Sequence, residues 1–96
     1  MAGQTGNQLL MARYMVVERF REGHSATVYA RFAKKGRMLP EGLDYIDSWL
    51  SARDDVCYQV METQTPETFD SWTRNWDDLV DFEIVELKTK PTGSET

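Results

Sequence analysis

The sequence has one cysteine and no long apolar run. Cys57 has no second cysteine to pair with, so a disulfide within the chain is excluded, which suits the reducing cytoplasm. No apolar stretch approaches the roughly 20 residues that a membrane-spanning helix requires. We therefore expect a cytoplasmic protein that does not cross a membrane.

Positive charge is also scarce. The 96 residues hold 11 Lys and Arg against 16 Asp and Glu, which gives a formal net charge of −5. Nucleic acid binding requires clustered cations for the phosphates, and an anionic membrane surface repels an acidic protein. We expect neither nucleic acid nor a membrane among the partners.

The motifs of common metal and cofactor sites are missing. One histidine and one cysteine offer no zinc-binding spacing, and the carboxylates do not follow the calcium-loop pattern with its central glycine. No glycine-rich phosphate loop, nucleophile elbow or dinucleotide fingerprint is present. We expect no metal and no cofactor.

The composition that remains is that of one globular domain. Hydrophobic residues make up 41% and charged residues 28% of the chain, which are ordinary values for a folded protein. A chain of 96 residues leaves no room for a second core. Because both ends are polar or rich in small residues, we expect a flexible leader at 1–12, one domain at 13–90 and a flexible tail at 91–96.

Hydrophobic periodicity divides this domain into six elements, since a period of two residues predicts strands and a period of 3.6 predicts helices. Capping residues support both helices. Ser25 is a plausible N-cap and Gly36 a C′ residue for the first, and Thr65 and Pro66 begin the second. In order, we expect a strand at 14–20, a helix at 26–35, strands at 43–50 and 56–63, a helix from 66 to about 77, and a strand at 81–87.

This βαββαβ order predicts an α+β protein with the ferredoxin-like fold. With right-handed crossovers, it produces a four-stranded antiparallel sheet with two helices on one face. The first and third strands are expected in the centre of the sheet. The other face of the sheet would then carry no helix.

The first strand is apolar on both of its sides. Tyr14, Val16 and Phe20 lie on one side, and Met15 and Val17 lie on the other. A strand in an open sheet normally alternates apolar and polar residues, because one side meets water. We therefore expect a homodimer in which two copies of the chain stack sheet against sheet.

Five blocks of the sequence resemble a bacterial family of unknown function, domain-of-unknown-function family 3303. They are MVVERF at 15–20, GRMLPEGL at 36–43, SW at 48–49, CYQVMET at 57–63 and WDDLVDFE at 76–83. The resemblance covers about residues 14–87 and implies a dimeric α+β barrel. Relatives in that superfamily include cofactor-independent monooxygenases of antibiotic biosynthesis, muconolactone isomerases and stress-responsive barrel proteins. It implies the fold but no reaction and no catalytic residue.

Glu18 lies in the middle of the first expected strand, between Val16 and Phe20. Burying an unpaired carboxylate is costly, so it requires a partner or a polar cavity. One interpretation is an ion pair with an arginine such as Arg37, or exposure near the end of the strand. The other is a general base or ligand anchor in a cavity between the sheet and the helices.

Gln59 and Cys57 share one face of the third strand, and Ser48 points toward them if the register permits. A buried amide needs several partners, which a structural network or a ligand would supply. Cys57 is either a small buried hydrophobe or a nucleophile, with His24 as its one possible histidine partner. His24 itself is either an exposed loop residue or a group at the border of the cavity.

The three tryptophans also allow two interpretations. They belong to the core or to an interface, or they line an aromatic pocket for a flat apolar ligand. The candidate cavity therefore comprises Glu18, His24, Arg37, Trp49, Cys57, Gln59, Trp72 and Trp76.

Three functions remain open at this point. The favoured one is a protein that binds a small apolar or aromatic ligand in the cavity between sheet and helices, or that serves a structural or sensor role. The alternative is a cofactor-independent enzyme resembling a monooxygenase or isomerase, with Glu18, His24 or Gln59 positioning an aromatic substrate. The third is a subunit of a larger assembly. The sequence does not indicate which ligand is bound or whether a reaction follows.

Overall fold

A computed structural model describes residues 11–88 of the chain. The elements follow the expected order and are β1 (Ala12–Phe20), α2 (Ser25–Lys35), β2 (Leu43–Leu50), β3 (Val56–Thr63), α3 (Thr68–Thr73) and β4 (Val80–Leu87). Residues 1–10 of the expected leader and the whole expected tail at 91–96 lie outside the described residues.

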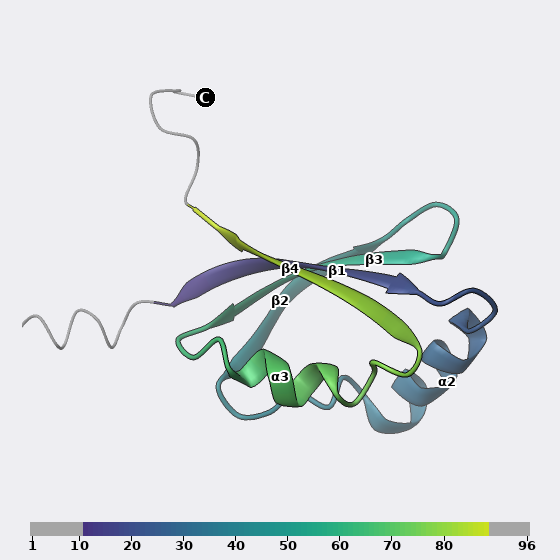
Figure 1. Cartoon of the computed structure of the whole chain (residues 1–96), viewed down its shortest axis with the longest axis horizontal. Helices are drawn as coiled ribbons and strands as arrows, with labels where there is room; N and C mark the ends of the chain where they lie inside the picture. The colour runs from purple at the N-terminus through teal and green to yellow at the C-terminus, as the bar shows by residue number, and fades with distance from the viewer. Residues whose placement is uncertain (1–10, 89–96) are drawn as a thin grey trace, which may run out of the picture.

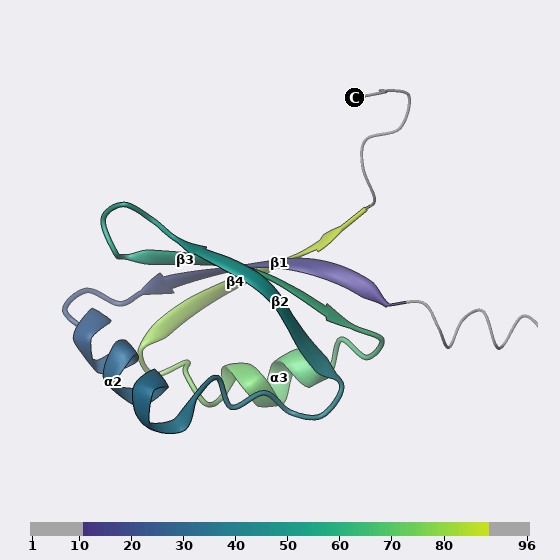
Figure 2. The ribbon, with the colours of Figure 1, turned by 180° about the vertical axis from the view of Figure 1, so that it is seen from behind.

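The four strands form one antiparallel sheet in the order β2-β3-β1-β4. β1 and β3 occupy the centre, as predicted. Both helices lie on the same side of the sheet (Figure 1), and the view from behind shows the same arrangement (Figure 2). The ferredoxin-like α+β fold is therefore confirmed.

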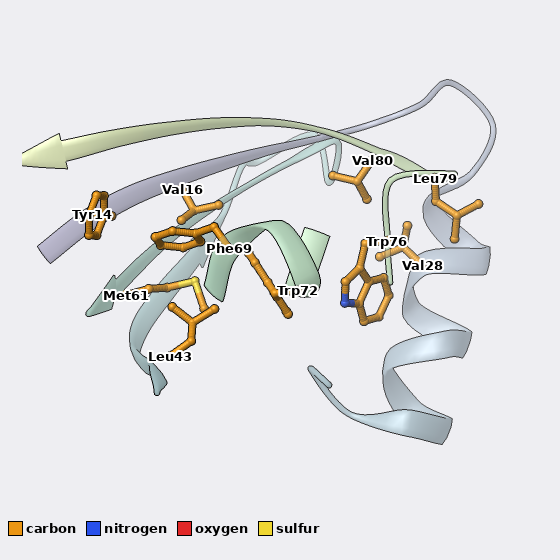
Figure 3. Close-up of a cluster of buried hydrophobic side chains, with 10 residues drawn as sticks. All are labelled: Tyr14, Val16, Val28, Leu43, Met61, Phe69, Trp72, Trp76, Leu79 and Val80. Atoms are coloured by element: carbon orange, nitrogen blue, oxygen red, sulfur yellow. The ribbon is translucent and has the colours of Figure 1, made fainter. Parts of the chain in front are cut away.

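The core lies between the sheet and the segment around α3. The rings of Tyr14 and Phe69 meet edge to face with their centroids 5.0 Å apart, and Trp72 has only 1% of its surface exposed. The aromatic side chains of α3 therefore pack into the core. The buried cluster in Figure 3 consists of Tyr14, Val16, Val28, Leu43, Met61, Phe69, Trp72, Trp76, Leu79 and Val80.

β2 does not alternate as strictly as expected. Its pairing with β3 shifts by one residue between Tyr45 and Asp47, which is a β-bulge. Beyond the bulge, Ser48 joins Tyr45 on the helix-covered face, and Trp49 turns to the opposite face. Strict alternation over residues 43–50 would place Trp49 on the same face as Leu43 and Tyr45, but one inserted residue reverses the alternation that follows.

The second helix is shorter than expected. α3 begins at Thr68 and ends at Thr73, and the chain continues through turns to residue 79. Within these turns the N–H of Asn75 donates to the carbonyl of Trp72 at 3.0 Å, and the N–H of Trp76 donates to that of Thr73 at 2.9 Å. These i→i−3 bonds replace the i→i−4 pattern of an α-helix, so the expected helix to about residue 77 is wrong.

The C-terminal end of α2 is as expected, whereas its N-terminal end is not. Ser25 is the first helical residue rather than the N-cap, a position that His24 occupies without a side-chain bond. The Ser25 hydroxyl donates instead to the carbonyl of Asp54 in the β2–β3 hairpin, at 3.4 Å. At the other end, Gly36 has a φ of 70° and donates to the carbonyl of Phe32 at 2.7 Å, as expected of a C′ glycine.

The face of the sheet opposite the helices is apolar in the middle and charged at both ends of β1. Arg13 pairs with Glu62 at 2.6 Å, and Arg19 pairs with Glu83 at 3.0 Å. The strand register places the apolar residues of this open face between and beside these pairs. They are Met15, Val17, Trp49, Val56, Tyr58, Val60, Val85 and Leu87.

No helix within residues 11–88 has the length and apolar character needed to cross a bilayer.

Candidate functional site

A cavity of about 290 Å³ opens between α2 and the helix-covered face of the sheet. Its size is near the lower end of the roughly 300–1,000 Å³ found for small-molecule sites. Most of its wall is aliphatic or aromatic, with a few polar side chains. The lining residues are Glu18, Phe20, Val28, Tyr29, Phe32, Arg37, Ser48, Leu50, Cys57, Gln59, Trp72, Trp76 and Val80.

The cavity exists because α2 packs on the sheet along only part of its apolar stripe. Val28 is 7% exposed and belongs to the core, whereas Tyr29 and Phe32 are 41% and 42% exposed. Both of these rings line the cavity, and the Tyr29 ring meets that of Phe20 edge to face at 5.9 Å. The apolar stripe of α2 is therefore divided into a packed part and a cavity wall.

Three polar side chains form a chain of hydrogen bonds in the wall of the cavity. The Nε–H of Arg37 donates to Oε1 of Gln59 at 3.3 Å, and Nε2 of Gln59 donates to Oε2 of Glu18 at 2.5 Å. Gln59 is only 4% exposed, and both ends of its amide are used. The amide therefore has one orientation and holds the Glu18 carboxyl at a set position.

Burial governs the acidity of Glu18. Removal from water raises its pKa from 4.5 to about 7, because the charged form loses its hydration. The hydrogen bond from Gln59, the charge of Arg37 and the Cys57 thiol counteract this effect only in part. Glu18 makes no ion pair with any residue in the described part of the chain, and it is half-buried rather than exposed.

Cys57 lies beside this carboxyl, and its thiol is a poor nucleophile. Burial and the negative charge of Glu18 raise the pKa of Cys57 to about 11. At neutral pH it is a protonated thiol that acts as a hydrogen-bond donor to Glu18. His24 is exposed at the start of α2 and is not among the residues of the cavity wall. The structure therefore does not assemble a Cys57–His24 pair at the cavity.

Both the backbone and the side chain of Arg37 are held in place by aromatic residues. The indole N–H groups of Trp72 and Trp76 both donate to its backbone carbonyl, at 2.9 and 3.1 Å. Its guanidinium lies over the ring of Tyr45 at 3.6 Å and over that of Phe32 at 5.0 Å. The two tryptophans thus serve the site as well as the core, because they anchor the residue that carries its positive charge.

The next residue, Met38, has a φ of 60°, an unfavourable conformation for a side chain of its kind. The side-chain amide of Asn75 donates to its carbonyl at 3.3 Å. Together with the two indole bonds to Arg37, this contact holds the connection between α2 and β2 against the segment that follows α3.

Six of the eight residues named from the sequence line the cavity, and two do not. Trp49 is 55% exposed on the open face of the sheet because of the bulge in β2, and His24 lies outside the wall. The residues that line the cavity but were not named as candidates are Phe20, Val28, Tyr29, Phe32, Ser48, Leu50 and Val80.

The bulge also determines where Ser48 and Leu50 lie. Ser48 was expected to point toward Gln59 if the register permitted, and the observed pairing of the two residues confirms this, whereas Leu50 was not expected at the cavity. The bulge brings both side chains to the cavity, and the Ser48 hydroxyl is hydrogen-bonded to that of Tyr45 at 2.6 Å. The one signal in the sequence was the position of Ser48 opposite Gln59, which depends on the register of the two strands.

The chemistry of the cavity is that of a carboxyl, an amide and a guanidinium between aromatic walls. Between residues 11 and 88, no group of three His, Cys, Asp or Glu side chains could hold a metal ion. The carboxyl exists in both protonation states near neutral pH, so it can donate or accept a proton.

No curated protein matches the chain significantly. Among solved structures, the chain is similar to a protein from Chloroflexus aurantiacus J-10-fl that is described provisionally as an antibiotic biosynthesis monooxygenase. The two are 13% identical with a TM-score of 0.49, over 91% of this chain and 98% of that one. The sequence profile of the family described as domain of unknown function DUF3303 matches residues 12–87. This match confirms the resemblance seen in the sequence, and the chain belongs to the DUF3303 family.

Proposed function

We propose that the protein binds a small apolar or aromatic molecule in the cavity between α2 and the sheet, as a binding or sensor module. The observation that carries this proposal is the wall itself, in which aromatic and aliphatic side chains surround a few polar groups. Small-molecule sites have this composition, because apolar walls supply affinity and a few polar groups set orientation.

The polar groups of the cavity support this role because they are already arranged. Gln59 holds Glu18, Arg37 holds Gln59, and the two indoles hold the backbone of Arg37. A ligand would therefore meet side chains that need little reordering, which lowers the entropy cost of binding.

A binding experiment with a blocked cavity tests the proposal. Indole, β-naphthol and β-tetralone are added to the purified protein, and thermal unfolding is followed. A ligand at about ten times its Kd stabilises a protein by about 1.4 kcal/mol, or about 6 °C for a domain of this size. We expect at least one probe to produce such a shift.

The Leu50→Trp variant provides the contrast, because Leu50 lines the cavity and is 44% exposed. The added indole fills the mouth of the cavity, so the shift should disappear. Ile46→Trp is the matched control, since Ile46 lies on the same strand with 43% exposure and is not part of the wall. The proposal is wrong if no probe stabilises the natural protein, or if Leu50→Trp retains the full shift.

We also propose that two copies of the chain pair through the open faces of their sheets, as in a dimeric α+β barrel. Tyr58 and Val85 are 40% and 43% exposed on this face, and Trp49 is 55% exposed. A large exposed apolar patch with a polar rim is typical of an interaction site. Because the rim includes the Arg13–Glu62 and Arg19–Glu83 pairs and so carries charges of both signs, a second copy is a complementary partner for it.

Sedimentation equilibrium at micromolar concentration tests this pairing, and we expect twice the mass of the chain. Tyr58→Glu adds a charge at the centre of the open face and should produce the single-chain mass. Ser71→Glu adds the same charge at an exposed position of α3, on the other side of the sheet, and should leave the mass at twice that of the chain. A natural protein that sediments as a single chain would rule out the pairing.

We place the protein in the cytoplasm, since its lone thiol suits a reducing compartment.

A further inference from the structure

We propose that the cavity is a site of proton transfer, in which Glu18 is the general base and acid and Arg37 binds the carbonyl oxygen of a flat, uncharged ketone. This inference rests on the proposed ligand cavity and assigns to it a class of substrate and a reaction.

The first argument is the position of the carboxyl. Among the described residues that line the cavity, Glu18 is the single acid, and it stands between aromatic and aliphatic side chains. Its Oε2 is occupied by the amide of Gln59, which fixes the carboxyl relative to the cavity. A base acts efficiently when it is held in place beside the proton that it removes.

The second argument is the separation of the two charges. Gln59 lies between Arg37 and Glu18 and is bonded to both. A direct ion pair would stabilise the carboxylate and weaken it as a base. With the amide between them, burial dominates and the pKa of Glu18 is about 7, so both of its protonation states are available at neutral pH.

The third argument is that the terminal amino groups of the Arg37 guanidinium are available to a ligand. Arg37 uses Nε–H for Gln59, and its terminal amino groups donate to no other side chain or carbonyl within residues 11–88. The group lines the cavity and is held over Tyr45 and Phe32. Pre-positioned N–H donors of this kind stabilise negative charge that develops on an oxygen during a reaction.

These groups define a balanced reaction. The Glu18 carboxylate takes a proton from the carbon next to the carbonyl, and the C–H electron pair becomes the C=C bond of an enolate. The negative charge moves to the oxygen, where Arg37 donates to it. The Glu18 carboxylic acid then returns the proton to the same carbon or to a conjugated one. The reaction consumes no oxidant or other co-reactant.

The walls select the substrate. Tyr29, Phe32, Trp72 and Trp76 present aromatic surface, which favours a flat ring system. The titratable and charged groups of the wall are Glu18, Arg37, Cys57 and Tyr29, and burial raises the pKa values of both the Cys57 thiol and the Tyr29 phenol. Both therefore remain uncharged at neutral pH, and Glu18 is the wall group that titrates near pH 7.

Hydrogen exchange into β-tetralone, a flat bicyclic ketone, tests the inference. The ketone and the protein are incubated in deuterium oxide. Proton NMR follows the loss of the signal from the hydrogens on the carbon next to the carbonyl, as deuterium replaces them. We expect the natural protein to accelerate exchange over buffer, with a rate that rises with pH through about 7 as the carboxylate forms.

Glu18→Gln should lower the accelerated rate by 100-fold or more, on the order expected for loss of a general base, while β-tetralone still raises the unfolding temperature. Arg37→Met should lower the rate by about 100-fold. Glu86→Gln makes the same chemical change on β4 outside the cavity, so its rate should equal that of the natural protein.

The outcomes separate this inference from the binding proposal. If β-tetralone binds and its exchange stays at the buffer rate, the proton-transfer inference is overturned and the binding proposal stands. If no ketone and no other probe binds, both are overturned. Should Glu18→Gln fail to fold, the natural protein still decides the matter, since exchange without a rise through about pH 7 contradicts Glu18 as the base.

Discussion

The two ends of the helix-covered face are built differently, although they belong to one sheet. Beside α3 the space is filled, and Phe69 and Trp72 are 4% and 1% exposed. Beside α2 the space is hollow, and Tyr29 and Phe32 retain 41% and 42% exposure. The filled end is packed mainly with apolar side chains, whereas the hollow end contains the Glu18–Gln59–Arg37 hydrogen bonds.

Anchors outside the cavity explain how α2 keeps its place above a hollow. Arg31 of α2 donates through both terminal nitrogens to the carboxylate of Asp78, at 2.9 and 2.8 Å, and to the carbonyl of Asn75 at 2.8 Å. The guanidinium also lies over the Trp76 ring at 5.6 Å. The two ends of the helix-covered face therefore have different roles. The packed core beside α3 stabilises the fold, and the cavity beside α2 provides room for a ligand.

Removal of an aromatic ring should have the largest effect at the filled end. We expect Phe69→Ala to lower the free energy of unfolding by about 3–5 kcal/mol, because it leaves a cavity among packed side chains. The matched change Phe32→Ala, at a half-exposed ring of the cavity wall, should cost only about 1 kcal/mol. Urea unfolding measures both values, and equal losses would contradict the division into a filled and a hollow end.

The hollow end should make stability depend on pH. The pKa of Glu18 is about 7 in the folded protein against an ordinary value of 4.5, so folding favours the protonated form. The contribution of Glu18 protonation to the free energy of unfolding is complete below about pH 4.5 and is lost as the pH rises through about 7. Between pH 5 and pH 8 the natural protein should lose on the order of 2–3 kcal/mol relative to Glu18→Gln, which does not titrate.

Chemical denaturation of both proteins at several pH values and one protein concentration measures this difference. Other carboxylates titrate in both proteins, so the difference between the two curves isolates Glu18. A difference that stays constant from pH 5 to pH 8 would mean that Glu18 keeps an ordinary pKa and that water reaches it freely.

Much of the fold could be predicted because it depends on local patterns. The strands at 43–50 and 56–63 were predicted with their observed bounds, since alternation and turn residues mark them clearly. Gly36 ends α2 as expected, because its positive φ suits a residue without a side chain. The order of the elements then leaves few topologies, and the observed sheet order is the one that right-handed crossovers predict.

The site was predicted only in part. Glu18 and Gln59 were recognisable as polar residues within apolar strands, and the structure brings them together with Arg37. Trp49 was misplaced, because a bulge depends on how β2 fits against β3 and leaves little trace in the residues themselves. The hydrogen bond from the Trp72 indole to the Arg37 carbonyl could not be predicted either, because it joins segments that are far apart in the chain. The homodimer stays a prediction.

The sequence by itself determined the class of fold, because this follows from periodicity and capping, and it marked Glu18 and Gln59 as polar residues within apolar strands. The family followed from the resemblance of five sequence blocks, which the match over residues 12–87 confirms. Only the tertiary structure decided that the apolar stripe of α2 stops short of full packing and that the bulge turns Ser48 into the resulting space. Whether apolar surfaces meet or leave a gap depends on the three-dimensional fit of side chains from distant segments, which no local pattern specifies.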